Sequence, residues 1–312
     1  MRTEVYCLKP HGPAHRASLA LLVIFAGFSP CAAEQAEEAK PPAAPWTVAK
    51  DSGWKELEPG LDLREETLDW KQLQGGKEAV LNLRLTAVRL DPKRLALRIV
   101  MNPVKDGKKL LEVARAEKVP VVANGAYFGT RDEPVTLLVS AGKALSKPNT
   151  KLTRSAVFTL DERGRAAVRR LDEVQPPYGG LDFAVQNSPW LVADGKAVYT
   201  ETKVEHRDGE FPARRHRRTG LGVSADGRVV LLVCNDGVWL AGFAEVLAAP
   251  EAAGGFAFDA AVNLDGGPSS GLVVEHEQAK VNVPTGPTLI PHVIAVSKRE
   301  KPLTDDPAAA KK

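Results

Sequence analysis

Residues 263–270, Asn-Leu-Asp-Gly-Gly-Pro-Ser-Ser, combine a carboxylate, two hydroxyls and two adjacent glycines in one short segment. The apolar run at residues 260–264 leads directly into Asp265, and a second apolar run follows the segment. Asp-Gly between such runs is a strong hairpin signal, because glycine adopts the positive φ that tight turns need. A hairpin needs only two such residues, whereas Ser269 and Ser270 add hydroxyls. The segment is therefore either a turn between strands or a reaction site built around Asp265.

The residues around Asp265 add further polar groups to the same place. If residues 260–264 form a strand, Asn263 and Asp265 point to the same side, because successive side chains alternate between the two faces. An amide would then lie beside the carboxylate. Gly266 and Gly267 carry no side chains, so a ligand can approach the backbone closely there.

A candidate cation lies upstream, at the end of the basic cluster formed by residues 214–218. Arg218 directly precedes the apolar run at residues 219–223, and a guanidinium at a strand end can bind a phosphate through two parallel hydrogen bonds. His216 is a candidate to assist or to donate a proton, although a lone histidine is weak evidence for such a role. For the other three members we expect a solvated basic loop: Arg214, Arg215 and Arg217.

A third polar group follows the strand-like run at residues 119–123. The amide of Asn124 is suited to bind a sugar hydroxyl or a phosphate oxygen, but asparagine before Gly125 is also typical of a simple turn. Tyr127 and Phe128 follow, and an aromatic ring there could stack on a sugar. We expect one of these two rings to belong to the core.

A second carboxylate, Asp236, follows the run at residues 229–234 and precedes a glycine, so a turn is again the alternative. Together with Asp265 it could form an acid/base pair, or the two could hold a metal ion. No group of histidines and aspartates has a clear metal-ligand spacing, so we predict neither a metal nor another cofactor.

The elements that must position these residues are mainly strands. Alternating or continuous apolar runs bounded by turn residues predict them at residues 80–90, 95–100, 119–123, 155–160, 166–171, 222–224, 229–233, 260–264 and 271–274. Asp226-Gly227 predicts a hairpin, as does the turn at residues 161–164. Apolar residues at helical spacing predict two helices, at residues 108–118 and 241–249. This pattern predicts an α+β fold: a single domain on a mixed, largely antiparallel β-sheet core with a few flanking helices.

The N-terminus has the features of a secretory signal peptide over residues 1–33. Basic residues precede the apolar run at residues 17–28, and small residues follow, so we expect cleavage after Ala33. A lipoprotein cleaved before Cys31 is the alternative, which the preceding proline disfavours. The mature protein is accordingly predicted to be secreted or periplasmic, with no transmembrane span.

The remaining composition indicates an ordinary globular domain over residues 54–298. Residues 34–53, rich in Ala, Glu, Lys and Pro, are expected to form a disordered linker, and residues 299–312 a disordered tail. A net charge of +3 gives no support for a nucleic-acid partner. After cleavage Cys234 is the sole cysteine, and its apolar surroundings predict a small buried hydrophobe.

Five segments, taken together, resemble motifs of the phosphodiester glycosidase family and occur in the family's order. The most specific is the segment around Asp265, which is close to the family's Asn-Leu-Asp-Gly-Gly-Gly-Ser-Ser. The similarity extends over most of the predicted domain, and its motifs lie at residues 124–128, 186–196, 218–223, 235–237 and 263–270.

The resemblance implies hydrolysis of a sugar joined through its anomeric carbon to a phosphodiester, giving free sugar and a phosphomonoester. Such chemistry needs a carboxylate beside the oxocarbenium-like centre and fixed cations or donors at the departing phosphate. Asp265 suits the first role and Arg218 the second. A carbohydrate or sugar-phosphate polymer of the cell envelope is the implied partner.

The chain departs from the family pattern at four positions: Ala126, Ser188 and Pro268 replace glycines, and Gly271 replaces a threonine. Proline removes an N–H group that could contact ligand. Two alternatives therefore stand beside the hydrolase: a non-catalytic envelope glycan-binding protein with the same fold, and a metal-dependent phosphodiesterase that cleaves the P–O bond.

Overall fold

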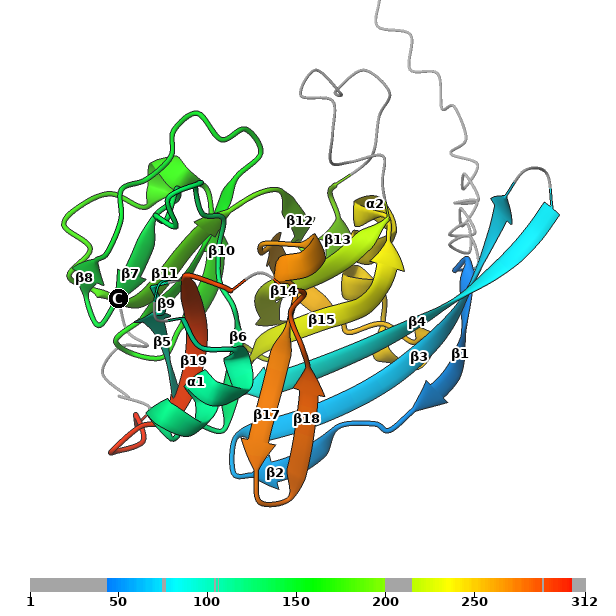
Figure 1. Ribbon diagram of the computed structural model, residues 1–312, viewed down its shortest axis with the longest axis horizontal. Coiled ribbons are helices and arrows are strands. Elements are labelled where there is room, and N and C mark those ends of the chain that lie inside the picture. The colour runs from blue at the N-terminus through cyan, green and yellow to red at the C-terminus, as the bar shows by residue number, and fades with distance from the viewer. Residues whose placement is uncertain are drawn as a thin grey trace, which may run out of the picture. The chain divides into compact units, whose positions relative to one another are not determined.

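Antiparallel strands make up most of the computed structural model, which describes residues 44–74, 77–103, 105, 107–199, 215–287 and 289–304 (Figure 1). The predicted signal peptide and residues 34–43 lie outside the described residues. Nine strands form the largest sheet: β1 Trp46–Asp51, β2 Lys55–Glu58, β3 Leu61–Gln74, β4 Lys77–Leu90, β12 Trp190–Ala193, β13 Lys196–Ala197, β14 His216–Ser224, β15 Val229–Val238 and β16 Phe258–Asn263. Their spatial order is β1-β3-β4-β15-β14-β16-β12-β13, with β2 on the other side of β3.

Two five-stranded sheets complete the domain. One has the order β10-β9-β11-β7-β8 and the other β18-β17-β6-β19-β5. Their bounds are β5 Leu95–Met101, β6 Val121–Asn124, β7 Leu138–Ser140, β8 Lys143–Ala144, β9 Ala156–Asp161, β10 Ala166–Arg169, β11 Leu181–Asn187, β17 Leu272–His276, β18 Ala279–Val283 and β19 His292–Lys298. Within the described residues every pairing of named strands is antiparallel, so the predicted parallel component of a mixed sheet is absent there.

The main hydrophobic core contains residues of all three sheets, for example Leu231 of β15, Ile294 of β19 and Phe158 of β9. These side chains are almost completely excluded from solvent. Because one core is shared by the three sheets, loops that cross from sheet to sheet are held firmly at both ends.

Two α-helices, α1 Leu110–Glu117 and α2 Leu240–Ala248, confirm the predicted helical segments to within about two residues. The apolar face of α1 packs on β6 and β17, while α2 covers strands of the nine-stranded sheet. Helix α1 begins with a capping interaction in which the Lys109 N–H donates to Glu112 Oε2 at 2.8 Å. It ends at Lys118, whose φ of 53° is left-handed. With so few helices, the fold is largely β. Three short 3₁₀ turns complete the elements: η2 Leu171–Glu173, η4 Glu251–Ala253 and η5 Gly267–Ser269.

Both predicted chain ends of the domain need correction. Residues 46–51, expected in the linker, form β1, because Trp46 is buried and stacks on Trp70 at 5.0 Å between ring centroids. At the other end, Leu303 donates its N–H to the Lys93 carbonyl at 2.8 Å, so part of the predicted tail is bound to the domain. The remainder, residues 305–312, lies outside the described residues.

Strand β3 was not predicted, because its charged residues conceal its apolar pattern. It pairs along its whole length with β4, as the long blue and cyan pair in Figure 1 shows. Arg64 on β3 is only 2% exposed and is satisfied by ion pairs to Asp51 at 2.9 Å and Glu66 at 3.1 Å. Burial raises the pKa of Glu66 to about 7 despite the opposing charge of Arg64.

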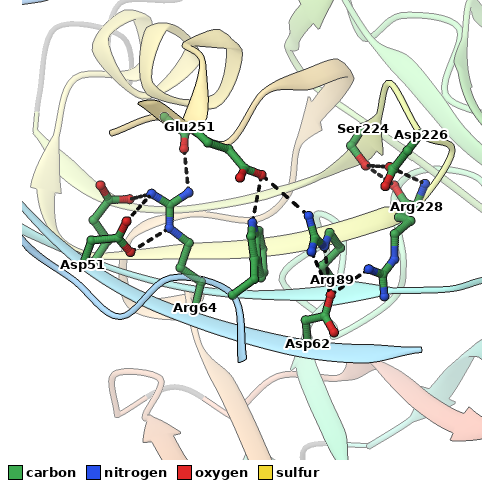
Figure 2. Close-up of polar contacts among 11 residues, drawn as sticks. Asp51, Asp62, Arg64, Arg89, Ser224, Asp226, Arg228 and Glu251 are labelled. Atoms are coloured by element: carbon green, nitrogen blue, oxygen red, sulfur yellow. Dashed lines mark hydrogen bonds and ion pairs between the residues drawn. The ribbon is translucent and has the colours of Figure 1, made fainter. Parts of the chain in front are cut away.

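A chain of polar contacts continues from β3 across the sheet (Figure 2). Asp62 of β3 accepts from Arg89 at 3.0 Å and from Arg228 at 2.7 Å. Glu251 accepts from the Trp54 indole at 2.8 Å and lies 3.6 Å from Arg89. These pairs attach the β14–β15 turn and the segment after α2 to β3 and β4.

Among the described residues, no helix has both the length and the apolar character needed to cross a membrane.

Candidate active site

The loop that carries Asp265 crosses between two sheets and is not a hairpin. Strand β16 before it pairs with β12 and β14 in the nine-stranded sheet, whereas β17 after it pairs with β6 and β18. The turn interpretation of residues 263–270 is therefore wrong in its simple form. The loop joins two sheets at a point where strand ends from both of them meet, which is a common way to assemble a site from distant segments.

Asn124, at the end of β6, holds this junction together. Its Oδ1 atom accepts from the Thr219 hydroxyl at 2.8 Å and from the Gly271 N–H at 3.1 Å. Its Nδ2 atom donates to the Asp265 carbonyl at 2.8 Å and to the Gly125 carbonyl at 3.2 Å. The side chain is fully buried and its hydrogen-bonding capacity is used within the protein. Asn124 thus positions the Asp265 loop, in place of the substrate contact that we expected from its sequence.

The surroundings of Asp265 in the protein favour the protonated, neutral form of its carboxyl group more than water would. Burial raises the pKa of this carboxyl from 3.8 to about 6, although hydrogen bonds from Ser269 and from the Gly266 N–H oppose the shift. The Gly266 N–H lies 2.9 Å from Oδ1, and the Asp265 N–H donates to the Gly125 carbonyl at 3.2 Å. Asp265 is therefore a rigidly held, half-buried carboxylate that changes charge within the physiological pH range.

Arg218 lies on β14, beside this loop, and is only 5% exposed. Its Nε donates to the Val238 carbonyl at 3.3 Å. A β-carbon placed on Gly266 would lie 3.7 Å from Arg218 Nη1, so the guanidinium reaches the glycine next to Asp265. Arg218 therefore lies close to Gly266, the residue that follows Asp265. That Arg218 and Asp265 act together at one site stays a prediction.

Tyr127 marks the same place from a third segment. The nearby charge of Asp265 adds to burial in raising the pKa of Tyr127 to about 12, and the charge of Arg218 opposes the rise. The Tyr127 hydroxyl donates to the Ser188 carbonyl at 2.7 Å and accepts from Asn263 Nδ2 at 3.2 Å. Its hydroxyl is thus anchored by protein partners, and its side chain lies within electrostatic reach of Asp265 and Arg218.

Asn263 is buried, and its Oδ1 atom has no hydrogen-bond partner in the structure. Its Nδ2 also donates to the Ser188 carbonyl at 2.9 Å. An unpaired buried carbonyl oxygen next to Asp265 is costly unless another group satisfies it. The side chain consequently holds an unsatisfied acceptor beside the Asp265 loop.

His292 is a buried neighbour that the sequence analysis missed. Burial lowers its pKa to about 4, so the imidazole is neutral at physiological pH. The Phe128 ring meets the His292 ring edge-on, with 6.5 Å between the two centroids. Phe128 therefore packs against the buried histidine. A β-carbon on Gly125 would lie 2.8 Å from the His292 carbonyl oxygen, so this position requires glycine. A single histidine at the start of a strand gives no periodic signal from which its position in the fold could be predicted.

Asp236 has a different environment from Asp265. Burial alone would raise its pKa, but hydrogen bonds from Arg84 lower the pKa overall. Arg84 contacts it with Nε at 3.0 Å and Nη2 at 2.9 Å. Asp236 lines a cavity of about 580 Å³ together with His216 and Trp239. Asp236 is thus engaged by Arg84, and the acid/base pair with Asp265 stays a prediction.

The remaining residues of the loop, from Gly267 to Ser270, differ in their contacts. A β-carbon on Gly267 would lie 3.9 Å from His216 Nδ1, which connects His216 to the site, and the φ of 60° at Gly267 favours glycine. Ser269 contacts Asp265, whereas Ser270 is fully buried and its hydroxyl has no partner. Pro268 fits the short turn η5, and its carbonyl accepts from Gly286 at 2.6 Å.

The three other departures from the family pattern are Ala126, Ser188 and Gly271, and each has a defined place in the structure. Ala126 is fully buried, and the Ser188 carbonyl holds both Tyr127 and Asn263 in place. A β-carbon on Gly271 would lie 2.8 Å from Leu110 Cδ1, so a larger residue would not fit without movement of α1.

Cys234 is buried and free, as predicted, and burial raises its pKa to about 12.

Metal ligands are not grouped around these residues: in the described part of the chain, no three or more His, Cys, Asp or Glu side chains are placed to hold one ion.

Arg214 of the basic cluster lies outside the described residues. Arg217 donates from Nη2 to the Pro284 carbonyl at 2.7 Å, and its pKa is lowered by burial. It is therefore less solvated than the loop residue that we expected.

Comparison with known proteins agrees with this geometry. The sequence matches the phosphodiester glycosidase family over residues 117–297, more than half of the 312 residues. The fold is similar to the zebrafish N-acetylglucosamine-1-phosphodiester alpha-N-acetylglucosaminidase catalytic domain auto-inhibited by its pro-peptide, with a TM-score of 0.60, 18% identity, and coverage of 81% of this chain and 88% of that chain. A Synechocystis protein gives a TM-score of 0.52 at 14% identity, with coverage of 79% of this chain and 63% of that chain. No curated protein matches the sequence. The family match includes Asn124, Arg218 and Asp265, and the chain belongs to the phosphodiester glycosidase family.

Proposed function

We propose that the chain is a hydrolase that cleaves the anomeric C–O bond of a sugar-1-phosphodiester and releases free sugar and a phosphomonoester. The observation that supports this proposal is the position of Arg218, an almost completely buried guanidinium, close to Gly266, which follows the carboxylate of Asp265 with its raised pKa. The two groups supply opposite charges at neighbouring points, as this reaction requires.

Asp265 stabilises positive charge at the anomeric carbon. With a pKa of about 6 the carboxyl is mostly ionised at neutral pH, and its partial burial strengthens its interaction with an oxocarbenium-like centre. That charge develops mainly in the transition state, so the carboxylate accelerates the reaction more than it tightens substrate binding.

Arg218 binds the departing phosphate. A buried guanidinium presents several donors in a fixed plane, and it remains protonated throughout the pH range of the reaction. A phosphomonoester is a far better leaving group than a sugar alkoxide, so neutralisation of its charge reduces the need for a strong general acid. His216 is near enough to Gly267 to assist at the same oxygen atoms.

The unpaired Oδ1 atom of Asn263 suits a sugar hydroxyl. Because this oxygen can only accept, it would bind an O–H group and not a phosphate oxygen. The site therefore distinguishes the two parts of the substrate: a hydroxyl acceptor and a carboxylate for the sugar, and a cation for the phosphate.

We also propose that the chain is exported after cleavage of residues 1–33 and acts on sugar-phosphate polymers of the envelope or the surroundings. The basic and apolar leader supports this proposal. Mature protein from a secreting host should begin near Glu34. N-terminal sequencing that finds Met1, or mass spectrometry that finds a lipid on Cys31, would contradict it.

The direct test of the activity is incubation of purified mature protein with an α-sugar-1-phosphodiester, followed by product analysis. Free sugar and phosphomonoester support the glycosidase, and sugar-1-phosphate with free alcohol supports a phosphodiesterase. Saturable binding without turnover supports the glycan-binding alternative. In the Asp265→Asn variant, turnover should fall on the order of 10²-fold or more while affinity largely survives.

A further inference from the structure

A second cavity, with a volume of about 900 Å³, lies outside the group of residues assigned to catalysis. Its lining includes Arg154, Arg170, Trp190, Val198 and Tyr199. The volume is within the range of small-molecule binding sites. The lining combines cations with apolar and aromatic surface, whereas the carboxylate of the catalytic site is not part of it.

Two residues of the cavity lining, Trp190 and Tyr199, lie near residues assigned to the catalytic site. Trp190 pairs with Val262 on β16, three residues before Asp265. Just before Trp190, the Ser188 carbonyl accepts the hydrogen bond from Tyr127 that was described above. The Tyr199 side chain contributes to the raised pKa of Tyr127, after the larger effects of burial and Asp265, which places it within electrostatic reach of the catalytic residues. A chain bound at Asp265 can therefore extend along β12 into the cavity.

The side chains of the cavity match a sugar-phosphate chain. Trp190 is half-buried and its indole Nε1 donates to the Val192 carbonyl at 2.6 Å, which fixes the orientation of the ring. Val198 is 49% exposed and adds apolar surface. A fixed ring beside an exposed aliphatic side chain provides the kind of surface on which a sugar ring packs.

The charged groups of the cavity favour an anion. The Arg154 guanidinium lies 5.8 Å from the centroid of the Tyr199 ring, and Arg170 pairs with Asp172 at 3.2 Å. Both members of the second pair are largely exposed, so the pair is weak and a phosphate can compete for Arg170. Among the described residues, the cavity lining contains two arginines and one aspartate.

The geometry points to a polymer subsite: the cavity binds the part of a glycosyl-phosphate chain adjacent to the scissile bond, with sugar rings on Trp190 and Val198 and phosphate at Arg154 and Arg170. This inference rests on the proposed function for the position of the scissile bond. It makes the preferred substrate an oligomeric glycosyl phosphodiester, in place of a single sugar joined to a small alcohol.

Kinetics on two substrates test this subsite: an α-sugar-1-phosphodiester of a small alcohol, and an oligomer with several glycosyl-phosphate repeats. The wild type should have a lower KM for the oligomer. The double variant Arg154→Gln/Arg170→Gln should raise the KM for the oligomer about tenfold, because it removes two exposed phosphate contacts. Its kinetics on the small substrate should not change. Arg169→Gln is the matched control, because Arg169 is exposed and adjacent but does not line the cavity.

Two results would overturn the subsite: an unchanged KM for the oligomer in the double variant, or an equal loss on both substrates in a correctly folded protein. If the wild type hydrolyses neither substrate, the proposed activity fails, and calorimetric titration with the oligomer then decides the subsite separately. Binding to the wild type that weakens about tenfold in the double variant supports the subsite, and equal binding or no binding refutes it.

Discussion

The hydrogen bond from Ser269 to Asp265 provides a quantitative test of the role of the carboxylate. Ser269→Ala removes one donor that lowers the pKa of Asp265, so that only the Gly266 N–H still opposes the effect of burial. A hydrogen bond to a charged group contributes about 1.5 kcal/mol at the low end of its range. Since one pKa unit corresponds to about 1.4 kcal/mol, the pKa of Asp265 should rise by about one unit in the variant.

The assay is the pH dependence of kcat/KM, which reports the essential groups of the free enzyme. If the ionised carboxylate is required, activity in the wild type should fall below a pH of about 6, where Asp265 takes up a proton. In Ser269→Ala this acidic limb should move to higher pH by about one unit. Ser270→Ala is the matched control, because its hydroxyl has no partner, and the limb should keep its position. An acidic limb that is the same in all three proteins would refute the assignment of the limb to Asp265.

Two further predictions address the cation and the stability of the fold. Arg218→Lys keeps the charge but loses the planar fork, so substrate affinity, turnover and inhibition by free phosphomonoester should all weaken, as measured by steady-state kinetics; unchanged product inhibition would contradict the phosphate contact. Because the folded-state pKa of Glu66 is raised from 4.5 to about 7, stability that is present below pH 4.5 is lost as the pH rises to about 7. That shift corresponds to at most about 3 kcal/mol, so Glu66→Gln should raise Tm by several degrees at pH 8 and by much less at pH 4, as followed by thermal denaturation. An equal change at both pH values would contradict the burial argument.

Much of the strand pattern could be predicted from sequence, because apolar alternation and turn residues are local signals. The hairpin at Asp226-Gly227 is present, with Gly227 at a φ of 79°. The partner strand of β4 was missed because Asp62, Arg64 and Glu66 of β3 are buried in ion pairs, whereas a sequence pattern treats charged residues as exposed. Burial of charge depends on partners from distant segments, which periodicity cannot identify.

The candidate site was predictable in part. Family resemblance assigned Arg218 and Asp265 to one site, and the structure places Arg218 close to Gly266, the residue after Asp265. The role of Asn124 was not predictable, because an asparagine next to glycine at a strand end is equally suited to a ligand and to a carbonyl of its own chain. Nor was the ion pair of Asp236 predictable, since its partner Arg84 lies on a strand far away in the sequence.

Water should replace the phosphate at the anomeric carbon, and hydrolysis in ¹⁸O-labelled water shows which bond breaks. Cleavage of the C–O bond places the label in the free sugar and leaves the phosphomonoester unlabelled. Mass spectrometry of products quenched before the free sugar exchanges its anomeric oxygen with solvent gives the answer, with unlabelled sugar in labelled water as the exchange control. We expect ¹⁸O in the sugar and none in the phosphomonoester. Label in the phosphomonoester would show attack at phosphorus and would contradict the roles assigned to Asp265 and Arg218.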